Sequence, residues 1–418
     1  MTDPTAYRDL KARFQPLFDE IGAGAIDREQ QRELAFEAVN QLRKAGFTAL
    51  RVPHAHGGAG ISLPVLFRLL IDLAEADSNL PQIVRAHFGF VEGRLSSRDA
   101  ASQDYWFAKV VAGQLWGAAM AERTDSSTNS VSLEPADPQN EQAGWVLNGE
   151  KYYCTGTIYA DWVAAVAMHD KDFFSVVVAV DAPGVTREDD WDGFGQRLSG
   201  SGTTRFDKVA VAHEHVLRRF KPSELRAESY ISSFYQLFHL ATLAGIARAA
   251  LSDATVFVQG RTRAFGVPGQ SNPKEDPLVQ RVIGRLSSLA YASETLVLTT
   301  AEVLEGVHQA ELTQSAQEAD YVEADIRTFQ AQQVVLEQVL EATTLLFEVG
   351  GASATSQARR LDRHWRNART LASHNPAIYR ERALGNYYLN GVSPGAAWRA
   401  LHEQDGTHSA TRDEASAV

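Results

Sequence analysis

The sequence predicts a mainly helical protein with a β domain in the middle of the chain. Apolar residues recur at three- and four-residue spacing over residues 6–113, and the same spacing returns from about 225 to 402. Between these regions lie short apolar runs, rich in β-branched residues and separated by turn residues. With 418 residues, 44% of them hydrophobic, the chain is long enough for two or three domains with substantial cores.

This division predicts four parts of the chain. They are an N-terminal helical domain over 1–113, a central β domain over 114–220, a C-terminal helical bundle over 221–402, and a polar, disordered tail over 403–418.

In the first part, helical spacing is clear over 36–43 and 63–74. Ser62 is the predicted N-cap of the second of these helices, because the proline that follows at 64 is tolerated in a first turn. The glycine-rich connection 52–62 lacks the Lys-Ser/Thr of a phosphate-binding loop, and no strand-to-helix unit surrounds it. We interpret it as structural.

In the middle part, Asn148-Gly149 predicts a hairpin turn, since this dipeptide suits a two-residue turn between strands. Strands are predicted over 162–168, 173–180 and 203–211. In the last part, the stretches 276–310 and 317–349 carry heptad-like apolar spacing, which is typical of an antiparallel helix bundle.

Composition and charge exclude several classes of protein. The net charge of −12 argues against nucleic acid as a partner. No apolar run of 18–20 residues and no apolar signal core at the N-terminus are evident, so we expect a cytoplasmic protein without a membrane partner. A single cysteine, Cys154, excludes an internal disulfide and a cysteine-rich zinc site.

Sulfur is scarce in this chain, which has one cysteine and three methionines. Two explanations fit this scarcity equally well. One is chance and genomic bias, and the other is that the protein is made when sulfur is limiting. The second hypothesis gains weight only if the chemistry of the site also concerns sulfur.

Four local motifs, in this order and spacing, resemble the acyl-CoA dehydrogenase superfamily across nearly the whole chain. They are Val52-Pro-His-Ala-His-Gly-Gly-Ala-Gly-Ile-Ser62, Leu147-Asn-Gly-Glu-Lys-Tyr-Tyr-Cys-Thr-Gly156, Gly195-Gln-Arg-Leu-Ser-Gly200 and Val349-Gly-Gly-Ala352. The resemblance implies that superfamily's fold, with a β-barrel-like middle domain and a C-terminal four-helix bundle. It also implies a homotetramer.

Three further elements resemble the flavin-dependent monooxygenases on this fold, in particular the dibenzothiophene and sulfone monooxygenases. They are Arg85-Ala-His-Phe-Gly-Phe90, the segment Trp191–Thr204 and Ser373-His-Asn-Pro376. The approach Arg366-Asn-Ala-Arg369 resembles the approach to the catalytic Tyr-Glu-Gly of the dehydrogenases, but His-Asn-Pro stands where that carboxylate would be. An Asn amide cannot ionise, so it cannot replace the base.

The resemblance implies a two-component enzyme. Reduced FMN would arrive by diffusion from a separate NAD(P)H-dependent flavin reductase, in place of tightly held FAD, and the chain has no nicotinamide-binding fingerprint of its own. O₂ is the expected co-substrate, acting through a C4a-hydroperoxyflavin. Together with the scarcity of sulfur, the resemblance favours a small organosulfur substrate, such as a sulfide, sulfoxide or sulfone, in sulfur scavenging.

Matched to the family's motifs, several residues are expected at the flavin. Tyr153 falls where an aromatic residue flanks the ring and Thr155 where a hydroxyl bonds near its reactive edge. Both could instead be ordinary strand residues. For the phosphate end, the candidates are Ser127, Arg263 (with Arg261 as the alternative) and Arg369.

For catalysis we expect His87, His374, Thr155 and Asn375. A neutral imidazole can donate from one nitrogen and accept at the other, which suits a site that must hold a proton without a strong base. His87 could instead be a satisfied core histidine, and Asn375 could cap the helix that begins at 376. The remaining histidines lack carboxylate partners, so no metal site is predicted.

Three other functions remain open at this stage. The chain could be an acyl-CoA dehydrogenase-like oxidoreductase with its base elsewhere, for which Glu228 is the available glutamate in the 225–250 region. It could be an N-hydroxylase on the same scaffold, or a non-catalytic flavin-binding subunit.

Overall fold

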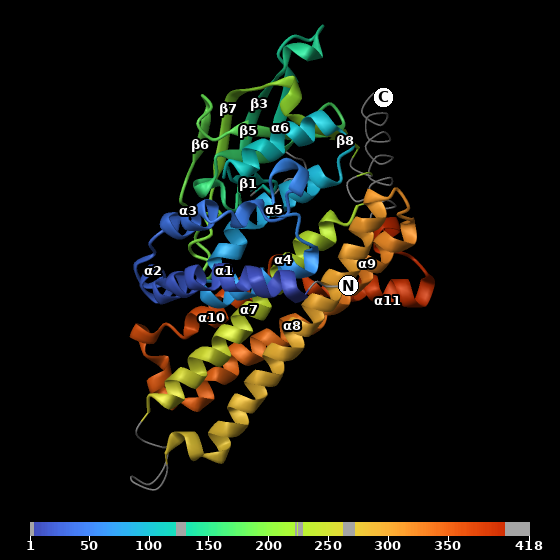
Figure 1. Cartoon of the computed structure of the whole chain (residues 1–418). Coiled ribbons are helices and arrows are strands. Elements are labelled where there is room, and N and C mark those ends of the chain that lie inside the picture. Colours follow the sequence, from blue (N-terminus) through green and yellow to red (C-terminus); the bar gives the residue numbers. More distant parts are fainter. Residues whose placement is uncertain (1–3, 123–130, 222–223, 225–228, 262–271, 398–418) are drawn as a thin grey trace, which may run out of the picture.

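The structure is a computed structural model that describes residues 4–122, 131–221, 224, 229–261 and 272–397 (Figure 1). Helices occupy the two ends of the chain and strands its middle, as predicted. The change from helix to strand falls between Val111 and Trp116, and the return to helix between Phe220 and Ile231. The predicted tail over 403–418 lies outside the described residues, and the division into domains stays a prediction.

The N-terminal part consists of helices and two 3₁₀ turns around one apolar core. The elements are α1 (Pro4–Ala23), α2 (Ala25–Gln31), α3 (Phe36–Lys44), η1 (Phe47–Ala49), η2 (His54–His56), α4 (Leu63–Ala76), α5 (Asn79–Leu95) and α6 (Ala100–Val111). Helix α4 begins directly after Ser62, as predicted. The serine side chain makes no cap, however, and the amide of Leu63 donates instead to Glu305 Oε2 at 2.7 Å.

The strands form one strongly curved sheet above the helices in Figure 1. They are β1 (Trp116–Ala119), β2 (Ser132–Pro135), β3 (Trp145–Lys151), β4 (Trp162–His169), β5 (Asp172–Ala179), β6 (Val185–Arg187), β7 (Thr204–Val211) and β8 (Val216–Phe220), in the order β6-β7-β3-β2-β4-β5-β8, with β1 beside β4. Helices α5 and α6 cover one face through an aromatic cluster of Phe90, Trp106 and Trp116. The other face encloses a second core that includes Cys154.

The predicted hairpin at Asn148-Gly149 is wrong. Both residues lie inside β3, which pairs with β7 through an irregularity between Leu147 and Gly149. Gly149 has φ of 128°, and Asn148 Oδ1 accepts a hydrogen bond from the amide of Lys208 at 2.8 Å. The features that suit this dipeptide to a turn therefore serve a β-bulge, which also tolerates a left-handed glycine.

The C-terminal part is an antiparallel set of helices built around α7. Its elements are α7 (Ile231–Gln259), α8 (Pro277–Leu312), α9 (Glu318–Leu345), α10 (Asp362–Ala372) and α11 (Ala377–Asn390). Among the described helices, α7 alone is long and apolar enough to cross a membrane, which corrects the expectation that no such stretch exists. Two thirds of its most apolar window is buried by α4, α5, α8 and α9, as in a core helix.

One loop of the β domain joins the strands to the helices that carry the C-terminal motif. The amide of Gln196 donates to Asn367 Oδ1 of α10 at 2.6 Å, and the amide of Leu198 donates to Asn79 Oδ1 at the start of α5 at 3.3 Å. Gly195 lies so close to α10 that a Cβ there would be 2.1 Å from the Arg366 carbonyl oxygen. These contacts fix the edge of the sheet against α5 and α10.

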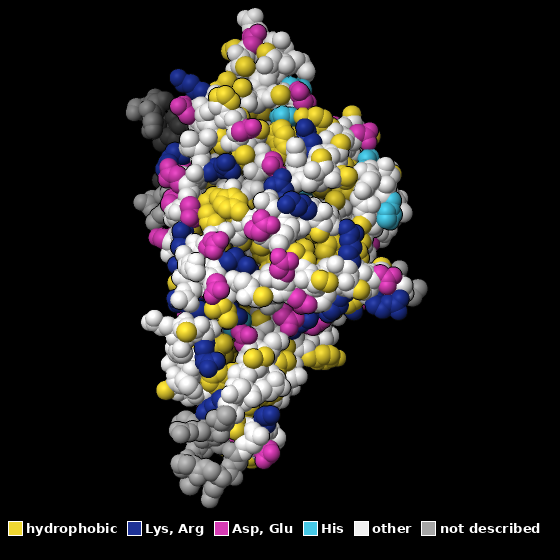
Figure 2. Space-filling view, turned by 60° about the vertical axis from the view of Figure 1, so that its left-hand side comes forward, with side chains coloured by type: hydrophobic (Ala, Val, Ile, Leu, Met, Phe, Trp, Pro, Cys, Tyr) yellow, Lys and Arg dark blue, Asp and Glu magenta, His cyan; other side chains and the backbone are white. Residues whose placement is uncertain are grey.

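The face shown in Figure 2 carries acidic and basic side chains interspersed with hydrophobic ones. No continuous basic area appears on that face.

Candidate functional site

Four side chains from three separate segments meet between α5, α7 and the loop that joins α10 to α11. They are Arg85 from α5, Tyr235 and His239 from α7, and His374 from the loop. The rings of His239 and His374 lie 4.3 Å apart between centroids, and the Arg85 guanidinium lies 5.2 Å from the centre of the Tyr235 ring. This cluster, which we call the His374 cluster, is brought together only by tertiary packing.

The cluster contains buried polar atoms that no described residue satisfies. His239 is 1% exposed, and neither of its ring nitrogens has a hydrogen-bond partner. The Nε of Arg85 is likewise buried without a partner. Buried polar groups are normally paired, so a cluster of unpaired ones points to a ligand or water that would complete it.

His374 is neutral at ordinary pH. Desolvation, together with the nearby cations Arg85 and Arg380, lowers its pKa to about 3. The residue nevertheless keeps a solvent-accessible surface. Because it is accessible and yet desolvated by surrounding protein, His374 can meet a ligand while remaining uncharged.

No carboxylate among the described residues acts on this cluster. Desolvation is the largest influence on the pKa of Arg85, His239 and His374, and the neighbours that also act on these pKa values are cations, an imidazole and a tyrosine. The site therefore offers neutral imidazole and guanidinium groups, and it offers no described base of the kind that removes a proton from carbon.

Asn375 anchors the loop that carries His374. Its Nδ2 donates to Gln236 Oε1 at 2.7 Å, and its carbonyl oxygen accepts from Gln332 Nε2 at 3.0 Å. The alternative role as a helix cap is not seen, because α11 begins at Ala377 without a side-chain cap. In this structure Asn375 ties the loop to α7 and α9.

Thr155 and Tyr153 lie on the β-domain side. The hydroxyls of Thr155, Ser201 and Ser199 form a buried chain with oxygen–oxygen distances of 2.9 and 2.7 Å. Tyr153 has φ of 61° and keeps 49% of its surface exposed, with its ring 6.1 Å from that of Trp191. The exposed Tyr153, with the partly buried Trp191 and the hydroxyl chain beside it, forms a suitable edge for a planar aromatic ligand.

His87 lies on the opposite side of α5 from Arg85. Its Nε2–H donates to the Thr48 carbonyl oxygen at 2.9 Å, and its Nδ1 accepts from the Trp116 amide at 3.4 Å. The side chain is fully buried and touches the Trp116 ring. Residues two apart on a helix are separated by roughly 200°, so the motif directs Arg85, and not His87, toward His374. These contacts favour the core role for His87.

The burial of His87 predicts a pH-dependent stability. Desolvation lowers its pKa to about 4, so the unfolded chain binds a proton near pH 6.5 before the folded chain does. The contribution of neutral, buried His87 to the free energy of unfolding is therefore complete above about pH 6.5 and is lost as the pH falls toward 4. His87→Gln should therefore reduce the stability difference between pH 7.5 and pH 5 by about 2 kcal/mol.

Urea unfolding of both proteins at the two pH values measures this difference. His213→Gln, at an exposed position, is the control and should leave the difference unchanged. An equal pH dependence in wild type and His87→Gln would contradict the prediction.

Comparison with known proteins follows the same division of the chain. Residues 117–209 match the acyl-CoA dehydrogenase middle domain, and residues 237–377 match the acyl-CoA dehydrogenase C-terminal domain. The chain belongs to the acyl-CoA dehydrogenase superfamily. The predicted resemblance is thereby confirmed, and so is the predicted fold.

Two curated relatives that cover nearly the whole chain are named as monooxygenases. The probable FMNH2-dependent monooxygenase SfnC of Pseudomonas putida is 27% identical over 94% of this chain and 98% of its own length. A dibenzothiophene monooxygenase of Rhodococcus qingshengii is 26% identical, with 93% and 95% covered. The FMN-bound structure of TdsC from Paenibacillus sp. A11-2 has a TM-score of 0.83 at 24% identity, with 92% and 99% covered. That last likeness establishes the fold.

The predicted phosphate-binding residues of this superfamily member are only partly described. Ser127 and Arg263 lie outside the described residues. Arg261 donates to the Val349 carbonyl oxygen at 2.7 Å and stacks on Phe257, so it is engaged within the chain. Arg369 is exposed on α10. Its role at a phosphate stays a prediction.

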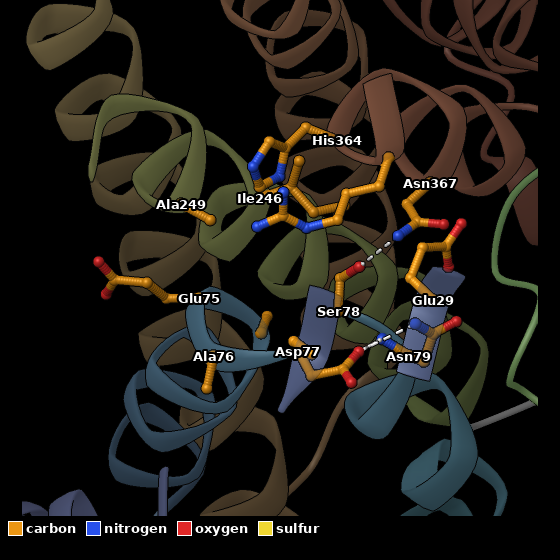
Figure 3. Close-up of a pocket in the computed structure, with 13 residues that line it drawn as sticks. Glu29, Glu75, Ala76, Asp77, Ser78, Asn79, Ile246, Ala249, His364 and Asn367 are labelled. Atoms are coloured by element: carbon orange, nitrogen blue, oxygen red, sulfur yellow. Dashed lines mark hydrogen bonds between the residues drawn. The ribbon is translucent and has the colours of Figure 1, made fainter. Parts of the chain in front are cut away.

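A separate small pocket lies between α2, the α4–α5 junction, α7 and α10 (Figure 3). It encloses about 330 Å³, part of it open to solvent. Asn367 crosses it and donates from Nδ2 to Ser78 Oγ at 3.0 Å, and its oxygen accepts from Gln196. None of the predicted site residues lines it, and its polar atoms join α10 to the N-terminal helices. We therefore assign it a structural role.

Sequence reasoning missed Arg85, Tyr235 and His239 as site residues. Tyr235 and His239 are four apart on α7 and so share one face. His239 is a histidine within a strongly apolar helix, and this was the available signal. Within the described ranges, no group of three or more His, Cys, Asp or Glu side chains is placed to hold a metal ion.

Proposed function

We propose that this chain is the oxygenase component of a two-component system that uses reduced FMN and O₂ to oxidise an organosulfur compound. A separate NAD(P)H-dependent reductase would supply the reduced flavin. A relative that covers nearly the whole chain supports FMN, because it is named for its dependence on FMNH2. A homotetramer in the cytoplasm remains part of the proposal.

The observation that carries this proposal is the chemistry of the His374 cluster. The sequence motif replaces the dehydrogenase carboxylate with His374, and the structure surrounds this residue with His239, Arg85 and Arg380. A dehydrogenase needs a base strong enough to take a proton from carbon, whereas a neutral imidazole can hold or donate a proton at a ligand oxygen. The cluster therefore favours oxygen transfer over dehydrogenation.

The described residues fit a planar flavin ring at the edge of the β domain. Tyr153 and Trp191 would flank the ring, and the Thr155–Ser201 hydroxyl pair would hydrogen-bond at its polar edge. When bound, the reduced flavin would activate O₂ for transfer of one oxygen atom to the substrate. On the helical side, His374 would hold a proton near the transferring oxygen, and its imidazole stays uncharged for that role.

Two observations support sulfur as the oxidised atom or its neighbour. Dibenzothiophene, the substrate named for several relatives, is an organosulfur compound. The chain itself contains one cysteine and three methionines. A protein made during sulfur limitation benefits from such a composition, so the composition and the relatives favour the same substrate class.

Rapid mixing of the purified protein and reduced FMN with O₂ tests the proposal. We expect an absorbance spectrum distinct from oxidised flavin that persists for seconds or longer, followed by product formation from a sulfide or sulfone. Immediate appearance of oxidised FMN with stoichiometric H₂O₂ would contradict the proposal and support a non-catalytic flavin carrier.

The same protein discriminates the other candidates. Bleaching of bound oxidised flavin by an acyl-CoA would support a dehydrogenase, whose suggested base, Glu228, lies outside the described residues. Oxygenation of amines in preference to sulfides and sulfones would support an N-hydroxylase; a relative named L-evernosamine nitrososynthase is 30% identical over 58% of the chain.

A further inference from the structure

Arg85 is a cation without an anionic partner in the described part of the chain. No carboxylate lies within ion-pair distance of its guanidinium, and its close neighbour is the face of the Tyr235 ring at 5.2 Å. Burial and Tyr235 are the influences on its pKa, and burial lowers it. By contrast, the buried Arg51 is paired with Glu92 in two hydrogen bonds of 2.6 and 3.0 Å.

A partly buried guanidinium without a counter-ion carries a desolvation cost that no opposite charge offsets, and the Nε of Arg85 is fully buried. The cation–π contact with Tyr235 offsets only part of that cost. Gly89, one turn along α5 from Arg85, leaves room for the Tyr235 ring, because a Cβ at this position would lie 2.0 Å from the tyrosine hydroxyl. The structure therefore holds the Arg85 guanidinium at a position where an anionic ligand could supply the counter-ion.

The neighbours of Arg85 supply further hydrogen-bonding capacity. Both nitrogens of His239 lack partners, and its ring lies against His374. A neutral imidazole has one N–H donor and one acceptor nitrogen. Arg380, the other cation that acts on His374 among the described residues, already donates to Gln236 and Gln332. Of these two cations, Arg85 is therefore the one with donors left for a ligand.

We propose that Arg85, assisted by His239, binds the sulfur oxyanion of a negatively charged organosulfur substrate, a sulfinate or a sulfonate. This inference rests on the proposed function and narrows its substrate class from organosulfur compounds in general to negatively charged ones. A tetrahedral or pyramidal sulfur oxyanion offers two or three acceptor oxygens, which match the fork of a guanidinium and an adjacent imidazole N–H. Binding through these oxygens would place the sulfur beside His374.

Equilibrium binding without turnover tests the inference. Isothermal titration of the flavin-free protein with benzenesulfinate, benzenesulfonate and the neutral methyl phenyl sulfone compares ligands of similar size. We expect wild type to bind at least one of the anions about tenfold or more tightly than the sulfone, since hydrogen bonds to charged groups are the stronger ones. The two anions distinguish sulfinate from sulfonate recognition.

Variants assign the preference to Arg85. Arg85→Gln should weaken anion binding by about 10- to 100-fold and leave sulfone binding within about twofold, whereas Arg85→Lys should retain part of the preference. His239→Phe should weaken anion binding by about fivefold or more. Arg8→Gln removes the same charge at an exposed position on α1 and should change neither.

Several outcomes would overturn the inference. They are equal affinities of wild type for anion and sulfone, unchanged anion binding in a folded Arg85→Gln, or a loss of reduced-FMN binding in that variant with anion binding intact. The wild-type comparison holds even if Arg85→Gln does not fold. Because no oxygen transfer is measured, failure of the proposed monooxygenase activity is seen separately, in the mixing experiment with reduced FMN and O₂.

Discussion

Replacing Arg51 with methionine is expected to lower the free energy of unfolding by about 3–5 kcal/mol. Arg51 is 4% exposed and binds both carboxylate oxygens of Glu92, which is fully buried and also accepts from the Tyr230 hydroxyl at 2.7 Å. The variant leaves that carboxylate buried without its cation. Urea unfolding at pH 7 measures the loss.

The structure provides a matched control for this prediction. Arg285 binds both carboxylate oxygens of Glu341 in the same way, at 2.7 and 2.8 Å, but both side chains are about half exposed. Arg285→Met should therefore cost less than about 1 kcal/mol. Equal losses in the two variants would show that burial does not set the value of the Arg51 pair.

The pH dependence of the Arg51 variant follows from Glu92. In wild type, Arg51 lowers the pKa of Glu92 against the effect of burial, so the pair stabilises the fold above about pH 4.5 and this contribution is lost at lower pH. Without Arg51, burial raises the pKa of Glu92, and protonation relieves the unpaired charge. The deficit of the variant should accordingly shrink as the pH is lowered from 7 to 5. The double variant Arg51→Met with Glu92→Leu should recover most of the stability.

Replacing His374 with alanine is expected to uncouple flavin oxidation from substrate oxidation. The fold should remain, because the described contacts of the His374 side chain are with His239 and Asn375, and the loop is held by Asn375 and Gln332. Without the imidazole at the transferring oxygen, product formed per reduced FMN should fall by about tenfold or more, with H₂O₂ in its place. Simultaneous assays of product and H₂O₂ measure the ratio.

Two observations separate a functional from a structural role for His374. The melting temperature of His374→Ala should stay close to that of wild type, and His213→Ala should show wild-type coupling. Since burial lowers the pKa of His374 to about 3, wild-type coupling should not follow a histidine titration between about pH 6 and 8. Full coupling in a folded His374→Ala would show that this residue only shapes the loop.

Much of the fold could be predicted from local pattern. Helix α9 and strands β4, β5 and β7 lie within one or two residues of their predicted bounds at most ends, because apolar periodicity decides which face of an element can be buried. The dipeptide Asn148-Gly149 shows the limit of such signals. Its backbone preference is local, but whether it makes a turn or a bulge depends on the strand that pairs with it, here β7.

The candidate site shows the same limit at the level of single residues. The motif Arg85-Ala-His87 contains two polar side chains that the sequence alone cannot assign to a face. In the structure, the Thr48 carbonyl and the Trp116 amide occupy both nitrogens of His87, while Arg85 faces α7. The sequence shows His239 only as a histidine in an apolar helix. Its place in the site becomes evident in the structure, where His374 from a segment more than one hundred residues away packs against its ring.

The sequence by itself determined the order of helical and β regions, the superfamily, and the replacement of a catalytic carboxylate by His374. These are properties of residue type, spacing and order, which need no knowledge of distant contacts. Only the tertiary structure decided which polar groups accompany His374, because α5, α7 and the α10–α11 loop bring them together from far apart in the chain. It also decided that Arg85 has no counter-ion among the described residues, since a missing partner becomes evident only when the side chains that surround a group are placed.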